Sequence, residues 1–98
     1  MPNYVIANSK IQGVGVISKR KYSPGDLIGV ALYRSEQPYP LTTHFGAHLN
    51  HSFKPNAETK NEGKYYKTYA IKIISPGDEI CVDYTVNKDL EQPEANWV

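Results

Sequence analysis

The sequence has a single cysteine, Cys81, and this scarcity excludes two common types of small protein. One cysteine cannot close a disulfide within the chain, and it cannot supply a cysteine-rich zinc site. No apolar run approaches the ~20 residues that span a bilayer, and the N-terminus has no signal-peptide pattern. These absences predict a soluble, intracellular protein that does not bind a membrane; they do not distinguish cytoplasm from nucleus.

The chain also lacks an excess of either charge. The chain has eleven Lys and Arg residues and 10 Asp and Glu residues, which gives a formal net charge of +1. We therefore expect no direct contact with nucleic acid. A length of 98 residues, 40% of them hydrophobic and 21% charged, is typical of one globular domain. We therefore predict a single domain over residues 1–98.

Helix-forming patterns are scarce, whereas short β-prone runs recur along the chain. Residues 34–43 contain two prolines and read as a loop, and residues 44–49 are long enough for one or two helical turns. A polar stretch over residues 58–64 carries a hairpin-turn signal, Asn61-Glu62-Gly63. The predicted strands cover Tyr4–Ala7, Val16–Lys19, Leu27–Tyr33, Tyr69–Ile74 and Glu79–Tyr84. The sequence thus predicts a mostly β fold of short strands joined by Pro/Gly corners.

One turn motif occurs twice. Ser23-Pro24-Gly25-Asp26 and Ser75-Pro76-Gly77-Asp78 lie 52 residues apart, and each is followed by a predicted strand. Proline at the second position and glycine at the third are typical of a type II turn. The pattern predicts two similar β-corners, which either a duplication or shared turn chemistry would explain.

Two further stretches are candidates for ligand binding. Asn50–Asn56 is polar and rich in turn formers, yet the apolar stretch Phe45–Leu49 leads into it. Such a lead-in suggests a buried loop that faces a ligand, because buried polar groups need partners; a plain turn is the alternative. Gly13-Val14-Gly15 allows either a tight bend or a close approach of backbone to a ligand.

Taken in order, the motifs of this chain resemble those of the SET domain, a family of protein-lysine methyltransferases that use S-adenosylmethionine. The matching motifs are Gly13-Val14-Gly15, the two Ser-Pro-Gly-Asp turns, Asn50-His51-Ser52 with Pro55-Asn56, and Asp83-Tyr84. The resemblance covers residues 11–84 and leaves a short tail, residues 85–98. It implies a β-clip-like fold with a C-terminal pseudoknot, in which the chain through Tyr84 passes beneath the loop that follows Asn50-His51.

The resemblance also implies roles for individual residues. Tyr84 would be the catalytic tyrosine beside the methyl-transfer channel, and Val82 and Trp97 would line the substrate lysine channel. The residues that would bind S-adenosylmethionine are Gly13, Val14, Gly15, Asn50, His51 and Tyr84. The implied reaction is methyl transfer to a lysine amine of a histone or another basic protein.

Three departures from the family pattern bear on these roles. Val14 stands where the family often has a larger residue, and residues 34–43 are shorter than the insert that usually helps to form the substrate groove. The zinc-binding cysteine cluster that follows the domain in many members is absent. Because eight tyrosines are many for this length and aromatic residues are enriched in interfaces, we also predict a homodimer that completes the groove.

Two alternatives stay open from the sequence. The shortened insert is compatible with a catalytically impaired SET-like module that binds a protein or the cofactor. Alternatively, His44, His48 and His51 would lie on one face of a continuous helix and could bind a metal, although Gly46 interrupts that helix and no acidic base accompanies the histidines.

Overall fold

Short strands form most of the regular structure of the chain. The computed structural model describes residues 3–11, 13–36 and 40–83, so Tyr84, Trp97 and the tail lie outside the described residues. The described elements, in order, are β1 (Tyr4–Asn8), β2 (Val14–Ser18), β3 (Leu27–Tyr33), β4 (Leu41–Thr42), α1 (His44–Ala47), β5 (Asn50–His51), β6 (Ala57–Asn61), β7 (Tyr65–Ala70) and β8 (Glu79–Val82). The prediction of a mostly β fold is confirmed.

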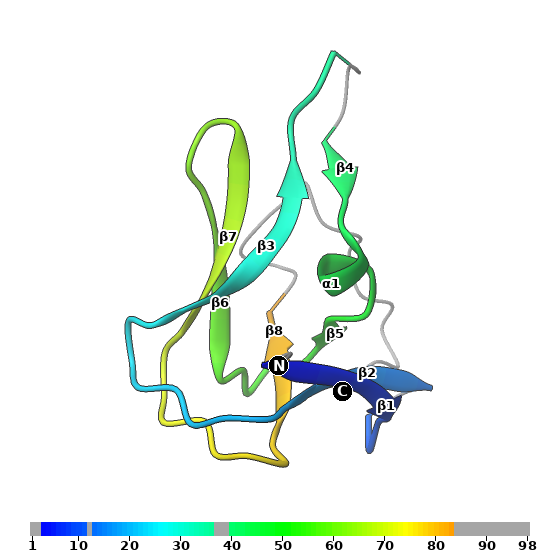
Figure 1. The fold of residues 1–98 in the computed structure, drawn as a ribbon, viewed down its shortest axis with the longest axis vertical. Helices are drawn as coiled ribbons and strands as arrows, with labels where there is room; N and C mark the ends of the chain where they lie inside the picture. Colours follow the sequence, from blue (N-terminus) through cyan, green and yellow to red (C-terminus); the bar gives the residue numbers. More distant parts are fainter. Residues whose placement is uncertain (1–2, 12, 37–39, 84–98) are drawn as a thin grey trace.

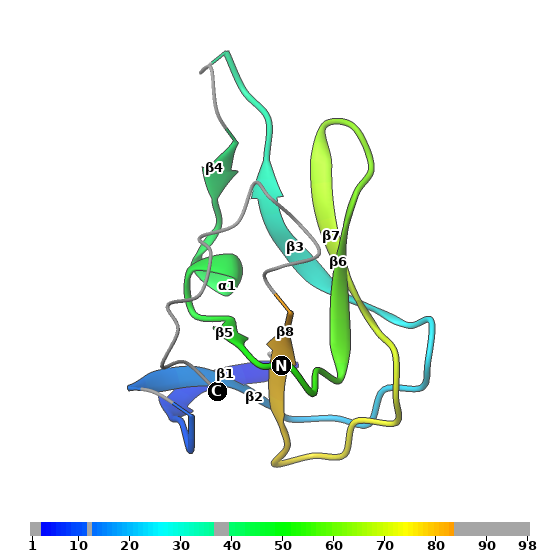
Figure 2. The ribbon, with the colours of Figure 1, turned by 180° about the vertical axis from the view of Figure 1, so that it is seen from behind.

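The strands form two four-stranded sheets. One has the order β1-β2-β8-β5 and the other the order β4-β3-β7-β6. Figure 1 shows β1 and β2 running across the lower part of the molecule, below the upright strands of the second sheet. Seen from behind in Figure 2, the single helical turn α1 lies between β4 and β5. The chain therefore leaves the second sheet through β4 and α1 and enters the first through β5.

The core is built from the inward faces of both sheets. β7 alternates strictly between exposed or half-buried and buried side chains, as the period of 2 of a β-strand requires. The buried apolar side chains include Val16, Tyr22, Ala31, Leu32, Phe45, Leu49, Tyr66, Ile74, Ile80 and Val82. Both sheets contribute to this list, so a single core holds them together.

The two repeated turns adopt the predicted type II geometry. Gly25 and Gly77 occupy the third position with φ of +93° and +94°, a region that favours glycine because it has no Cβ. In each turn the amide of the last residue, Asp26 or Asp78, donates to the carbonyl of the first serine at 3.0 Å.

Each turn also binds the strand that leads into the other turn. The amide of Gly25 donates to the carbonyl of Ala70 at the end of β7, and the amide of Gly77 donates to the carbonyl of Ser18 at the end of β2, both at 2.8 Å. Ala70 and Ser18 return the bond through their own amides, which donate to the carbonyls of Asp26 at 2.9 Å and Asp78 at 2.8 Å. The two corners are thus related by a reciprocal set of hydrogen bonds.

The residues that precede the two turns complete this arrangement. Tyr22 and Ile74 exchange backbone hydrogen bonds of 2.9 and 3.0 Å across an isolated antiparallel bridge, and both side chains are buried. Equivalent positions of the repeat therefore pair with each other, so the repeated motif has a structural counterpart in the fold.

Three local predictions need correction. The strand predicted over Tyr69–Ile74 is wrong, because β7 covers Tyr65–Ala70 and the side chains of Ile71 and Ile73 are 37% and 61% exposed. β6 and β4 lie in segments predicted as a polar stretch and a loop. Both are edge strands of their sheet, and an edge strand carries polar side chains that weaken its hydrophobic pattern. The strand Leu27–Tyr33 and one helical turn after Thr43 are confirmed.

The paired corners predict a coupled effect of two glycine substitutions. Gly25→Ala and Gly77→Ala each place a Cβ at positive φ, so each should lower the free energy of unfolding by about 1–2 kcal/mol. Because the corners bond to each other's strands, the double variant should depart from additivity by more than about 0.5 kcal/mol. Urea unfolding measures all three, with the exposed Lys21→Ala as the control. Additive effects would show that the corners act independently.

Candidate functional site

Strand β8 brings the predicted site segments together. It pairs antiparallel with β2, with Val16 opposite Ile80 and Ile17 opposite Glu79. On its other edge it pairs parallel with β5 over Asn50–His51. The Gly13-Val14-Gly15 motif at the start of β2 and the Asn50-His51 motif of β5 therefore flank the same four-residue strand.

The carboxylate of Glu79 occupies the space above Gly15. A Cβ on Gly15 would lie 2.3 Å from Glu79 Oε2 and 3.0 Å from Asn50 Nδ2. The hydroxyl of Ser9 donates to both carboxylate oxygens of Glu79, at 2.8 and 2.9 Å, and Asn50 Nδ2 donates to Oε2 at 2.9 Å. The absence of a side chain at Gly15 thus makes room for Glu79, whereas the sequence suggested close approach of a ligand.

The same side chains hold the loop between β1 and β2. Ser9 Oγ accepts from the amide of Ile11 at 2.8 Å, and the amide of Ser9 donates to the carbonyl of Gly13 at 2.9 Å. Gly13 has φ of +53°, and the carbonyl of Val14 accepts from Asn50 Nδ2 at 3.1 Å. Val14 is 46% exposed, so the motif presents one apolar side chain at the surface, while the carbonyls of Gly13 and Val14 are hydrogen-bonded within the protein.

Asn56 fastens the loop after β5 to β8. Its Nδ2 donates to the backbone carbonyl of Glu79 at 2.8 Å, and its Oδ1 accepts from the amide of Cys81 at 3.0 Å. The side chain thereby takes the place of a neighbouring strand along one residue of β8. The amide of Ser52 continues the same connection by donating to the carbonyl of Val82 at 2.9 Å.

His51 is buried beside the end of β8. Its ring is 4.2 Å from the Phe53 ring, edge to face, and its Nδ1 is 3.8 Å from Asp83 Oδ1. α1 ends at Ala47 and His51 belongs to β5, so the three histidines do not share a helical face and the metal alternative loses its geometric basis. No group of three potential metal ligands occurs in the described ranges.

Two residues of β8, Val82 and Cys81, are buried and do not reach the cluster of Ser9, Asn50 and Glu79. Val82 is 1% exposed and packs in the hydrophobic core, so its assignment to a lysine channel stays a prediction. Cys81 is buried, and burial raises the pKa of its thiol, which keeps it protonated at neutral pH. Tyr84 and Trp97 lie outside the described residues.

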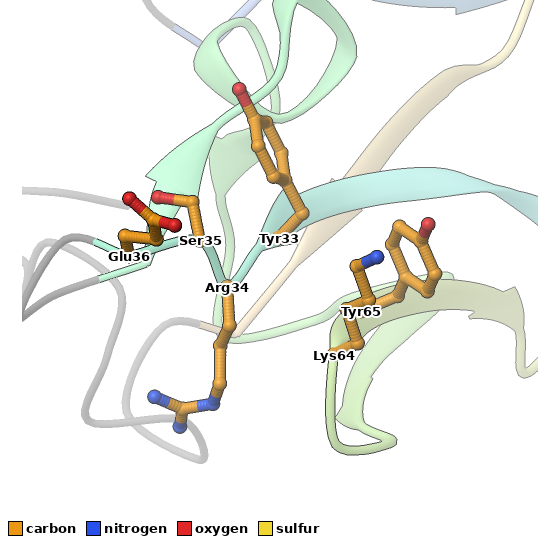
Figure 3. A pocket seen from close by; sticks show the side chains of 6 residues that line it. All are labelled: Tyr33, Arg34, Ser35, Glu36, Lys64 and Tyr65. Carbon is orange, nitrogen blue, oxygen red and sulfur yellow. The ribbon is translucent and has the colours of Figure 1, made fainter.

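Two hollows adjoin the described elements. A cavity of about 480 Å³ borders Glu79; the residues around it are Ala7, Asn8, Lys10, Ile11, Ile17, Gly77, Asp78 and Glu79. An open groove of about 630 Å³ lies at the end of β3; Figure 3 shows its lining side chains, Tyr33, Arg34, Ser35, Glu36, Lys64 and Tyr65. The first hollow meets the candidate site at Glu79, and neither Gly15 nor Asn50 lines it. The second lies where the shortened insert begins.

The sequence did not single out Ser9, Asn56 or Glu79 for the site, although their contacts unite it. Asn56 belongs to the motif Pro55-Asn56, which offered a signal. Glu79 begins the predicted strand Glu79–Tyr84 and precedes the apolar run Ile80-Cys81-Val82. A carboxylate next to buried apolar side chains needs hydrogen-bond donors, which was the available signal for Glu79.

Comparison with known proteins agrees with this geometry. The family model of the SET domain matches residues 33–85, which are 53 of the 98 residues. The chain belongs to the SET-domain family. No curated protein matches its sequence.

Solved structures with the SET fold superimpose on most of the chain. A Plasmodium falciparum protein described as a candidate histone methyltransferase is 23% identical with a TM-score of 0.72, over 86% of this chain and 94% of that one. Chaetomium thermophilum Polycomb Repressive Complex 2, as a humanized mutant bound to an inhibitor, is 19% identical with a TM-score of 0.69, over 86% of this chain and 15% of that one.

A further structure, of ctPRC2 in an autoinhibited conformation bound to S-adenosylmethionine, is 18% identical with a TM-score of 0.70. It covers 88% of this chain, and the chain spans only 15% of the length of that one. At these identities the likeness establishes the SET fold that the sequence predicted. In the described part of this SET domain, no helix is long and apolar enough to cross a membrane.

The contacts of Asn56 predict a large effect of one substitution on stability. Asn56→Ala removes the partners of two backbone groups of β8, and an unsatisfied buried group costs about 1–3 kcal/mol. We expect the free energy of unfolding to fall by at least about 2 kcal/mol, measured by urea denaturation. The exposed Asn8→Ala on β1 is the control and should change stability by less than about 0.5 kcal/mol. Equal effects of the two substitutions would contradict the role of Asn56.

Proposed function

We propose that this SET domain is an S-adenosylmethionine-dependent protein-lysine N-methyltransferase. The observation that carries the proposal is the convergence of Gly15, Asn50 and Glu79 beside β8, where Glu79 also borders a cavity of about 480 Å³. The family and the bound cofactor named for one structural neighbour support it.

The residues at this site fit an amphipathic cofactor. The loop around Gly13 and Val14 lies at the surface, and Asn50 carries a side-chain amide, a group that can both donate and accept hydrogen bonds. The His51 ring contacts Phe53 and Asp83. These contacts would hold the backbone of β5 in place beside the adenine group of S-adenosylmethionine. S-adenosylmethionine would supply an electrophilic methyl group on a sulfonium.

Methyl transfer to an amine requires alignment and a neutral nucleophile. A free lysine titrates near 10.4, so its deprotonation at pH 7 costs about 4–5 kcal/mol. A narrow, water-poor channel and a nearby cation both lower the pKa of the amine. Within this proposal Tyr84 orients the amine lone pair, and Trp97 and Val82 line the channel.

A SET-like binding module is the second candidate, and the short insert favours it. In the described residues, β4 contributes only Leu41–Thr42 and pairs directly with β3, so little chain is left to wall a substrate groove. We propose that the protein substrate is histone-like or otherwise basic. Its binding would then require surfaces other than the short insert. A protein that binds the cofactor without transferring methyl groups would be this module.

Tritium transfer tests the enzyme directly. With labelled S-adenosylmethionine and a panel of lysine-rich proteins, the wild type should transfer label, and Tyr84→Phe should lower the rate about 10²-fold with nearly unchanged cofactor affinity. The substitution keeps the ring, so stability should fall by only about 0.5–1.5 kcal/mol. A folded Tyr84→Phe protein that retains more than about half the rate would remove the catalytic role.

We also propose a homodimer, for which the groove at the end of β3 provides a surface. Tyr33 and Tyr65 are cross-strand partners, are 37% and 41% exposed, and stand on one side of the strands while Arg34 points the other way (Figure 3). Tyr66, one of the eight tyrosines that suggested an interface, is fully buried and cannot contribute.

Light scattering at assay concentration should give twice the mass of one chain for the wild type. The Tyr33→Ser/Tyr65→Ser double variant should give the mass of one chain, because it removes the two exposed rings from the proposed interface. A wild type with the mass of one chain would exclude the dimer.

A further inference from the structure

The repeated corner has the same backbone twice but two different surfaces. Residues 19–26 and 71–78 run side by side along the lower edge of the molecule in Figures 1 and 2, joined by the bridge between Tyr22 and Ile74. These two residues occupy equivalent positions of the repeat, and both are buried. The residues just before them are both exposed, yet one is Lys21 and the other is Ile73. The repeat is therefore alike on its buried side and unlike on its outer side.

Lys21 and Ile73 lie on one face of the paired corners. Tyr22 and Ile74 are opposite each other across the antiparallel bridge, and their side chains belong to the hydrophobic core. Because successive side chains of extended backbone point to opposite sides, Lys21 and Ile73 point outwards. They are diagonal neighbours across the bridge, a separation that a long side chain spans. A cation and an apolar side chain are thus adjacent at the surface.

The first corner supplies a basic half, Lys19-Arg20-Lys21. All three side chains are exposed, and within the described residues no ion pair includes any of them. The guanidinium carbon of Arg20 lies 4.6 Å from the centre of the Tyr22 ring, and Arg20 Nε donates to the carbonyl of Lys21 at 3.0 Å. The carboxylate of Asp26 accepts from a backbone amide of its own turn at 2.8 Å. Exposed cations of this kind, one of them held in place, favour an anionic partner.

The second corner supplies an apolar half. Ile71 and Ile73 are 37% and 61% exposed, with the exposed Lys72 between them. The fold does not require apolar side chains at these positions, because the equivalent residues of the first corner are Lys19 and Lys21. Apolar surface is unfavourable in water, and an exposed apolar patch bordered by polar residues is typical of an interaction site. The isoleucines therefore indicate a partner that covers them.

We propose that residues 19–21 and 71–73 form a docking surface for an acidic protein segment that carries apolar side chains. Its carboxylates pair with the basic half, and its apolar side chains cover Ile71 and Ile73. The cations repel a basic substrate, so a lysine-rich protein does not bind here. The surface precedes β3, whereas the groove at Tyr33 lies at the other end of that strand (Figure 1), so docking leaves the groove open. This inference goes beyond the proposed function and does not depend on it.

Three labelled synthetic peptides test the chemistry of the partner by fluorescence anisotropy. The first contains glutamate, leucine and serine, the second has lysine in place of every glutamate, and the third has serine in place of every leucine. The wild type should bind the first at least about tenfold more tightly than either of the others. The absence of saturable binding of the first peptide, or equal affinity for the first and the third, would overturn the proposal.

Substitutions in each half test the surface itself. Lys21→Glu and Ile73→Ser should each lower the affinity for the first peptide at least about tenfold, and Ile73→Ser should leave the affinity for the leucine-free peptide within about twofold. Both side chains are exposed, so urea denaturation should show the wild-type midpoint for each variant. Lys60→Glu reverses an exposed charge on β6 and should keep the affinity for the first peptide within about twofold.

Two other anionic partners are measured in the same way. Duplex DNA and vesicles that contain phosphatidylserine both attract exposed cations. If either binds more tightly than the first peptide and Lys21→Glu weakens that binding, the surface serves a different partner and the proposal is wrong. If Lys60→Glu weakens peptide binding as much as Lys21→Glu does, the attraction is due to overall charge, and no docking surface exists at the corners.

Discussion

Strand β8 has four residues, and each segment of the candidate site hydrogen-bonds to it or to its first side chain. β2 pairs with one edge, β5 pairs with the other, and Asn56 binds the backbone on both sides of Ile80. Such a short strand between two others is stable only because these partners come from distant parts of the chain. Displacement of β8 would therefore separate Gly15 from Asn50 and remove the candidate site.

The second Ser-Pro-Gly-Asp corner fixes where β8 begins. The second turn binds the end of β2 through Gly77 and Ser18, and β8 starts immediately after that turn. The register of β8 against β2 is thereby set by turn geometry as well as by the strand itself. Since the first corner binds β7 in the same way, one local motif anchors a strand in each of the two sheets.

Much of this structure was predictable from local chemistry. Proline and glycine at fixed positions predicted both corners, and a continuous apolar run predicted β3. The ordered motifs predicted the family and the segments that meet at β8. The prediction failed where tertiary contacts decide the outcome, as for the polar edge strand β6 and for Ile71 and Ile73, which are apolar yet exposed.

The roles of Glu79 and Gly15 show why the rest was out of reach. A sequence gives the identity of Gly15 but does not say which side chain fills the space above it. That side chain comes from a position 64 residues later in the chain, and only the pairing of β2 with β8 brings the two together. The contact between Asn56 and Cys81 likewise depends on a long-range pairing that no local pattern encodes.

We propose that the cofactor binds where β2 and β5 flank β8. Titration of the ¹⁵N-labelled protein with S-adenosylhomocysteine, followed by backbone and side-chain amide resonances, locates the ligand directly. We expect saturable shifts of the Gly13, Gly15 and His51 amides and of the Asn50 side-chain amide, with the amides of Lys64 and Tyr65 unchanged. Shifts confined to the groove at Tyr33 and Tyr65, or no saturable shift near β8, would contradict the account.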